Sequence, residues 1–210
     1  MADLDALSAG LSPLPDTADE LKQIAKTLGV ADSEIKLQNQ ASETIVKSSA
    51  LDQYKIIHFA THGLVAGVFD GLAEPAIALT LPKIATDKDD GLLTASEVAQ
   101  LKLNAEWVIL SACNTASGQN LGSEALSGLA KSFIFGGAKA LLVSHWPVFS
   151  DAAVKLTTKA FQEIKNNPGV GRTEAIRRSM VALINDSSLA RNAHPSVWAP
   201  FVVVGESGIN

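Results

Sequence analysis

Four short runs of mostly apolar residues recur along this chain of 210 residues, and helical periodicity fills the intervals between them. A run that is apolar throughout is typical of a parallel strand that is buried on both faces of a sheet. Strands that alternate with helices of about 10–15 residues indicate βαβ units with right-handed crossovers. The sequence therefore predicts an α/β fold, a three-layer α/β/α sandwich around a mostly parallel central sheet, with strands at residues 54–61, 106–112, 138–146 and 199–205.

The helices predicted before and between these strands have recognisable boundaries. In the first of them, Asp16 or Thr17 is the predicted N-cap and Gly29 ends the helix. Thr94 and Glu97 have the spacing of a capping box, which predicts that another helix begins there. Further amphipathic helices are expected at residues 42–51, 123–136, 151–165 and 172–185.

The remaining segments are less regular. A short strand is expected at residues 34–38, and a strand or hairpin within residues 64–81. Residues 1–15 contain the breaker Ser-Pro-Leu-Pro and are predicted to be a loose lead-in segment. Residues 16–210 then form a single domain, which is an ordinary domain size.

Composition excludes several classes of protein. The formal net charge is −5 and no basic stripe is present, so neither nucleic-acid binding nor membrane association is expected. The acidic N-terminus lacks the apolar core of a signal peptide. A single cysteine fits a reducing compartment, so we expect a soluble cytoplasmic protein.

Two of the predicted strands end on residue types that can carry chemistry. His62 follows the strand at 54–61, and Cys113, the only cysteine, follows the strand at 106–112. Ligands of open α/β sheets bind outside the carboxyl ends of the strands. If these two strands are neighbours, both side chains lie in the same crevice.

A cysteine and a histidine in one crevice could act as a nucleophile and its base. His62 could take the thiol proton and return it to a leaving amine, because imidazole titrates near neutral pH. The backbone N–H groups of Gly63 and Cys113 could form an oxyanion hole. The alternative is that Cys113 is a small buried hydrophobe and His62 a polar core residue. The residue types alone leave both interpretations open.

Several sequence blocks, in order, resemble the CHAT peptidase family. The blocks are HFATHG, DGLLTASEVAQLKL, VILSACNTASG, GSEALSGLAKSFIFGGAKALLVSHWPV and WAPFVVVGE, within residues 13–206. These domains are caspase-like, belong to the same clan as caspases and separase, and are often associated with tetratricopeptide repeats. The resemblance implies a cysteine endopeptidase that uses His62 and Cys113 to cleave a protein or peptide substrate. The separation of 51 residues between the two is near the roughly 50 residues noted for caspases.

The resemblance also points to a substrate pocket and to partners. His145 and Trp146 are expected to line the substrate cleft. Asp151 would select a basic side chain if one inserted residue is allowed, and otherwise it is the N-cap of the helix at 151–165. Family domains usually begin with further strands, so the chain could be a fragment, and a repeat or other regulatory module is expected on the same chain or on another.

No cofactor is expected, and His58 and His62 are too far apart on an extended strand to share a metal ion. His58 is instead expected to have a core role. The second functional hypothesis is a catalytically inactive CHAT-fold module that acts in interaction or regulation. A thiol hydrolase that acts on small molecules is a third hypothesis.

Overall fold

The computed structural model describes residues 3–111, 122–146 and 148–206. The central sheet has four strands in the order β1-β5-β6-β7. Strands β1, β5 and β6 run parallel, and β7 pairs antiparallel with β6. Their bounds are Ile56–Phe59 for β1, Trp107–Leu110 for β5, Ala140–Ser144 for β6 and Phe201–Gly205 for β7.

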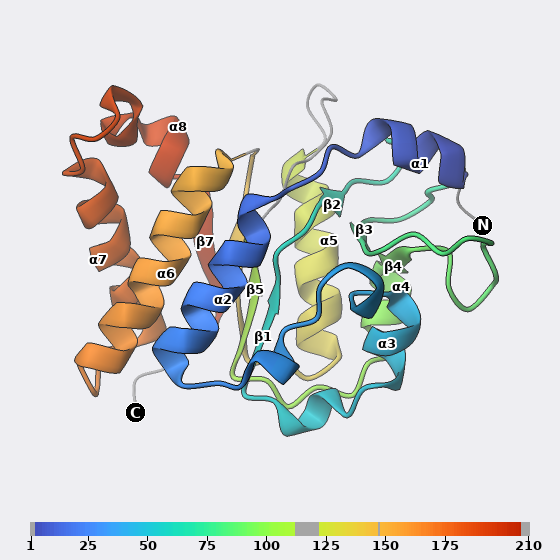
Figure 1. The fold of residues 1–210 in the computed structure, drawn as a ribbon, viewed down its shortest axis with the longest axis horizontal. Helices are drawn as coiled ribbons and strands as arrows, with labels where there is room; N and C mark the ends of the chain where they lie inside the picture. The colour runs from blue at the N-terminus through green and yellow to red at the C-terminus, as the bar shows by residue number, and fades with distance from the viewer. Residues whose placement is uncertain (1–2, 112–121, 147, 207–210) are drawn as a thin grey trace.

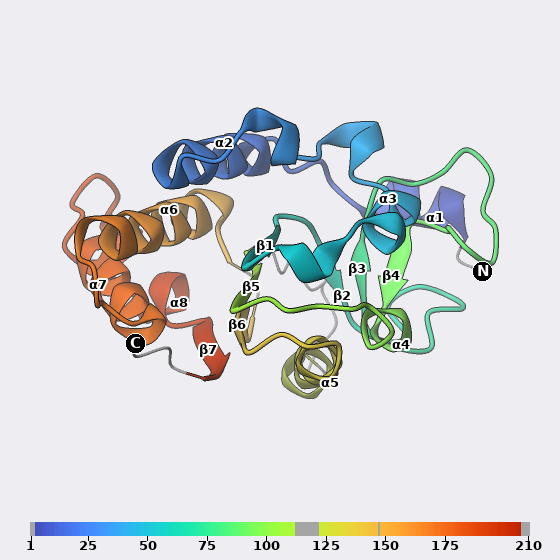
Figure 2. The same ribbon diagram turned by 90° about the horizontal axis from the view of Figure 1, so that it is seen from below.

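Helices cover both faces of this sheet, which confirms the predicted α/β fold. Figure 2 shows α2 and α6 on one side of the strands and α5 on the other. Alternate residues of β5 point to opposite faces: Trp107 and Ile109 pack toward α2 and α6, and Val108 packs toward α5. The helices are α1 (Leu4–Gly10), α2 (Asp16–Leu28), α3 (Glu43–Ser48), α4 (Ala95–Val98), α5 (Gly122–Phe135), α6 (Ser150–Asn166), α7 (Arg172–Ile184) and α8 (Pro195–Trp198).

A second, antiparallel sheet lies beside the β1 edge of the core (Figure 1). It has the order β2-β3-β4, with bounds Gly63–Leu64, Ala76–Ala78 and Leu92–Thr94. The strand expected within residues 64–81 is therefore present as β3. The capping box is also confirmed, because the Thr94 N–H donates to Glu97 Oε2 at 2.9 Å at the start of α4.

Residues 1–15 differ from the loose segment that was predicted. Asp3 caps helix α1 by accepting from the N–H groups of Asp5 and Ala6. Leu7 is fully buried against the apolar residues of the small sheet, including Leu64. Burying a leucine side chain contributes about 1.5–3 kcal/mol, which favours the packing of this short helix on the domain.

One boundary prediction and one strand prediction were wrong. Helix α2 begins at Asp16 with Pro15 as its N-cap, although Gly29 ends it as predicted, in a left-handed conformation (φ 72°). Residues 32–34 and 38–40 form 3₁₀ turns in place of a strand at 34–38. The two apolar residues of this segment, Ile35 and Leu37, line a pocket, and no strand within the described residues pairs with them.

Candidate functional site

Strands β1 and β5 are direct neighbours, as the site hypothesis required. They pair in parallel, and the register places Phe59 opposite Leu110 at their carboxyl ends. His62 lies three positions beyond Phe59, and Cys113 lies three positions beyond Leu110. The chain therefore leaves both strands at the same edge of the sheet. Each candidate residue follows the last paired residue of its strand by three positions.

His62 is buried and oriented by a backbone group. It lies between β1 and β2 along the chain, only 6% of the residue is exposed, and Nε2 is 2.7 Å from the carbonyl oxygen of Ser12. A carbonyl can only accept a hydrogen bond, so Nε2 carries the proton. The other ring nitrogen, Nδ1, has no hydrogen-bond partner among the described residues. Neutral His62 therefore presents an unprotonated Nδ1 that can act as a base.

Cys113 lies outside the described residues, so the pairing of its sulfur with His62 stays a prediction. The last described residue before Cys113 is Ser111. It is fully buried, and its N–H donates to the Phe59 carbonyl at 3.2 Å. This bond extends the pairing of β1 and β5 by one residue toward Cys113.

The Gly63 N–H is not used by the strand pairing around it. Gly63 lies opposite Ile77, and the Ala78 N–H donates to the His62 carbonyl at 2.9 Å. This pattern makes Gly63 and Ile77 a non-hydrogen-bonded pair of the antiparallel ladder. The Gly63 N–H therefore points away from β3, as an oxyanion donor would have to. Its role in an oxyanion hole, like that of the Cys113 N–H, remains untested.

A buried polar network lies beneath the strand ends. Glu20 of α2 is 1% exposed and accepts from Ser111 Oγ at 3.0 Å and from Thr157 Oγ of α6 at 2.6 Å. His58 Nε2 is 2.8 Å from Ser111 Oγ and 3.3 Å from Glu20 Oε1. Because the single Ser111 hydroxyl proton is donated to Glu20, the His58 Nε2 must carry a proton and donate. The network ties both helices to the strand that leads to Cys113 and gives His58 the expected core role.

Glu20 is held in its charged form. Burial raises the pKa of this carboxyl. Hydrogen bonds from His58, Thr157 and Ser111, together with the charge of His58, lower the pKa by more than burial raises it. The net effect is a pKa below the ordinary value. A buried carboxylate with three donors is a strong link between the elements that supply them.

His145 and Trp146 follow β6 at the same edge of the sheet. His145 is exposed, and its N–H donates to the Pro200 carbonyl at 2.9 Å. Trp146 is 39% exposed, and its ring donates from Nε1 to the Ser196 carbonyl at 3.1 Å. Because β6 is parallel to β1 and β5, these residues lie at the edge of the sheet that also carries His62. Their contact with substrate stays a prediction.

Asp151 is not an N-cap. Helix α6 begins at Ser150 with Phe149 as its N-cap, which places Asp151 in the first turn, where a carboxylate favours the positive end of the helix dipole. Both Asp151 oxygens accept from Arg191, at 2.9 and 2.8 Å. Arg191 also lies over the Phe149 ring, 4.5 Å from its centroid. A substrate side chain that bound Asp151 would therefore compete with Arg191.

Replacing Asp151 with Asn should change stability little. The ion pair with Arg191 is exposed to solvent on both sides, and such pairs contribute at most about 1 kcal/mol. Chemical denaturation of the variant should therefore give a free energy of unfolding within about 1 kcal/mol of the wild type. A larger loss would mean that the pair holds α6 in place.

Sequence reasoning missed Ser12, Glu20, Ser111 and Thr157. Glu20 did give a signal, because it lies one turn before Ile24 on the apolar face of α2, where an acidic residue needs a buried partner. Ser12 acts through its backbone carbonyl, a group that every residue has, so the residue type at this position gives no signal in the sequence. Within the described residues, no three metal-binding side chains cluster and no helix has the length and apolar character to cross a membrane.

The fold and this edge of the sheet define an α/β protein of caspase-like type, with a histidine and a cysteine following two adjacent parallel strands. The chain matches the family model of the CHAT domain over residues 2–206, and it belongs to that family. Among known relatives it is similar to tetratricopeptide repeat protein 28 of Mus musculus, with 27% identity over 223 residues, and to that of Homo sapiens, with 26% over 220 residues. These alignments cover 92% of this chain but 9% and 8% of the relatives, so the chain spans less than a tenth of their length.

Proposed function

We propose that this CHAT domain is a cysteine endopeptidase in which Cys113 is the nucleophile and His62 is its base. The observation that carries the proposal is the state of His62 at the shared strand edge. Its Nε2 lies 2.7 Å from the Ser12 carbonyl oxygen, to which it can only donate, so the acceptor of the neutral ring is Nδ1, a buried atom with no hydrogen-bond partner among the described residues. The register of β1 and β5 supports placing Cys113 near that nitrogen.

The first chemical step follows from these groups. Nδ1 of His62 takes the proton from the Cys113 thiol, and the thiolate attacks the carbonyl carbon of the peptide bond. The Ser12 carbonyl stabilises the imidazolium that forms, because it accepts a hydrogen bond from the Nε2–H group throughout the reaction. The N–H groups of Gly63 and Cys113 stabilise the negative charge that develops on the carbonyl oxygen. In comparable sites each such donor stabilises the transition state by about 3–4 kcal/mol.

The second half of the cycle returns the enzyme to its starting state. The imidazolium of His62 gives its proton to the leaving amine, and the carbon–nitrogen bond breaks to leave a thioester on Cys113. His62 then removes a proton from a water molecule that attacks the thioester. The cleaved acid leaves, and the thiolate is reprotonated by His62.

The test is the cleavage of a peptide library by the wild type and by a Cys113→Ala variant. We expect cleavage by the wild type and none by the variant, because alanine has no nucleophile. Equal cleavage by both proteins would end the proposal. Absence of cleavage by either, together with an unactivated thiol, would favour an inactive interaction module.

We also propose that the domain works beside a tetratricopeptide-repeat module, which would select the substrate. The support is that both similar proteins are named tetratricopeptide repeat proteins and are far longer than the aligned region. A soluble location in the cytoplasm fits the single cysteine.

A further inference from the structure

The carbonyl that orients His62 belongs to a short connection between two helices. Figure 1 shows residues 11–15 running from α1, beside the small sheet, to α2, beside the central sheet. Ser12 is an exposed residue of this connection, but its carbonyl oxygen lies 2.7 Å from Nε2 of the buried His62. The place of this connection therefore decides whether the His62 ring keeps its acceptor.

The connection is tied to the helix on each side of Ser12. Toward α2, the Leu14 carbonyl accepts from the Thr17 hydroxyl at 2.7 Å. Toward α1, the Leu11 N–H donates to the Leu7 carbonyl at 3.0 Å, which is the last hydrogen bond of that helix. Ser12 thus keeps its place only while both helices stay packed on the domain.

Helix α1 is packed on the domain through few side chains. Leu7 is fully buried and Leu11 partly buried in one cluster with Leu64 and Phe69. A side chain at Gly10 would come within 2.7 Å of the Phe69 ring, which shows that helix and ring are in close contact. A helix of seven residues is unstable alone in water, where about 12–15 residues are needed. The helix therefore exists only while it is packed, and it can detach without unfolding the central sheet.

Helix α2 is anchored more firmly than α1. It has 13 residues and buries Glu20, Ile24 and Ala25. Glu20 accepts from Ser111 at 3.0 Å and from Thr157 at 2.6 Å, so this helix is bonded to β5 and to α6. Of the two helices that hold the connection, α1 is the one that can be released locally.

We propose that residues 4–15 form an N-terminal strap that sets the His62 ring for catalysis, with Leu7 as a positioning residue of the site. While the strap is packed, the Ser12 carbonyl accepts from Nε2 and leaves Nδ1 as the acceptor of the ring. When Leu7 leaves the small sheet, Nε2 loses this acceptor, and the ring loses its fixed tautomer and its fixed orientation. Any event that draws the strap away would therefore switch the site off. The catalytic consequence rests on the proposed function, whereas the effect on the ring does not.

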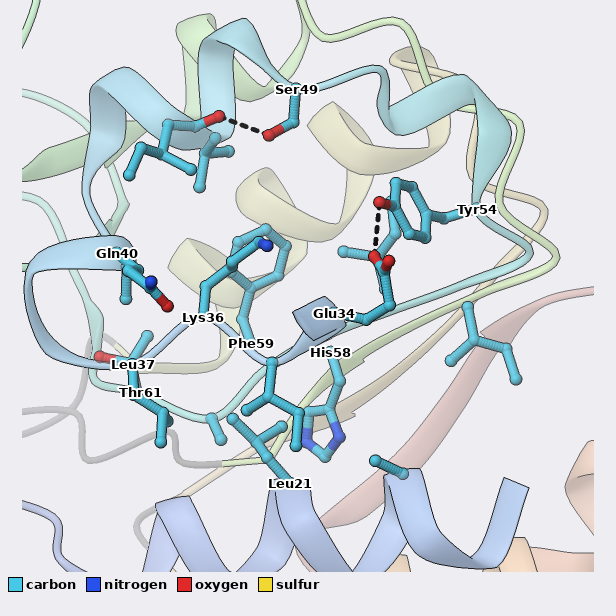
Figure 3. A pocket seen from close by; sticks show the side chains of 18 of the residues that line it. Leu21, Glu34, Lys36, Leu37, Gln40, Ser49, Tyr54, His58, Phe59 and Thr61 are labelled. Carbon is cyan, nitrogen blue, oxygen red and sulfur yellow. Dashed lines mark hydrogen bonds between the residues drawn. The ribbon is translucent and has the colours of Figure 1, made fainter. Parts of the chain in front are cut away.

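The neighbouring His58 gives an internal reference for this effect. Figure 3 shows it at the wall of a pocket, beside Leu21 of α2. Its Nε2 lies 2.8 Å from Ser111 Oγ, in the network with Glu20, so its ring N–H is held by elements other than α1. Release of the strap should change the ring N–H of His62 and leave that of His58 as it is.

The experiment follows the two Nε2–H protons by NMR and measures their exchange with water in the wild type and in Leu7→Ala. A buried, hydrogen-bonded ring N–H exchanges slowly, and the spectrum of His62→Ala identifies the His62 signal. We expect the His62 proton to exchange roughly tenfold faster or more in Leu7→Ala, and the His58 proton to be unchanged. The kcat for a cleaved library peptide should also fall roughly tenfold or more, because the wrong tautomer of the base lowers kcat by about 10⁴ in the Ser-His-Asp triad.

Two further variants separate positioning from general stability. Leu7→Met conserves the volume of the side chain and should restore the exchange and the kcat of the wild type. Ile176→Ala removes a similar apolar volume from α7, where Ile176 is 3% exposed in a different cluster, and both quantities should stay within about twofold.

Several results would overturn the proposal. They are a wild type without a slowly exchanging His62 proton, unchanged exchange of that proton in Leu7→Ala, and the same acceleration in Ile176→Ala or at the His58 proton. If the ring protons behave as expected but the wild type cleaves no peptide, the proposed peptidase function fails while the control of His62 by the strap is supported.

Discussion

Replacing Glu20 with Ala should lower the free energy of unfolding by about 3–5 kcal/mol, the usual cost of removing one member of a buried charged pair. Glu20 is 1% exposed and accepts hydrogen bonds from Ser111 and Thr157, beside His58. Without it, these donors lose their acceptor in the interior of the protein. Urea denaturation at neutral pH measures the change.

Asp19→Ala is the matched control, since Asp19 neighbours Glu20 on α2 but its side chain is 75% exposed. Its effect should not exceed about 1 kcal/mol. If the two variants lose similar stability, the buried network does not hold α2 on the sheet.

The contribution of Glu20 should also depend on pH in one direction. Its folded pKa is lowered below the ordinary value of 4.5, so the folded state binds this proton more weakly than the unfolded state does. The stabilisation is therefore fully present above pH 4.5 and is lost as the pH falls through the folded pKa. The part of the stability difference between the wild type and Glu20→Ala that arises from this carboxyl should therefore shrink below pH 4.5. A difference that grows in that acidic window would contradict the sign of the shift.

Replacing His62 with Ala should reduce peptide cleavage by about 10²–10⁴-fold, the usual contribution of a general base. The loss follows from the removal of the Nδ1 acceptor and of the proton that would go to the leaving amine. The rate is measured on whichever library peptide the wild type cleaves. The maximal rate kcat should account for most of the loss, because His62 is proposed to act on protons and not to bind substrate.

His194→Ala is the control for this variant. His194 caps α8 by accepting from the Ser196 N–H, so its loss should affect local stability without affecting catalysis. Circular dichroism establishes that both variants are folded. If His62→Ala retains cleavage within about twofold of the wild type, another group must be the base.

Much of the central sheet could be predicted from sequence because its signal is local. The apolar runs gave all four strands, and their alternation with helices gave the α/β class. The strand at 54–61 was predicted too long, because regular pairing with β5 covers only Ile56–Phe59. The antiparallel β7 was not distinguished from the parallel strands, since a buried strand has the same composition in either direction.

The surroundings of the site could not be predicted because they depend on contacts between distant segments. The Ser12 carbonyl is 50 residues from His62 along the chain, and Ser111 is 91 residues from Glu20. The small sheet was also missed in part, because β2 has two residues and β4 has three, too short for a periodic pattern.

The most direct test of the account is the pH dependence of Cys113 alkylation by iodoacetamide, in the wild type and in His62→Ala. Cys113 is the only cysteine, so the rate reports on that thiol alone. If Nδ1 of His62 lies beside the sulfur, the wild-type rate should rise with a midpoint well below the unperturbed thiol pKa of about 8.5, and the variant should return to about 8.5. A midpoint near 8.5 in both proteins would contradict a shared catalytic site.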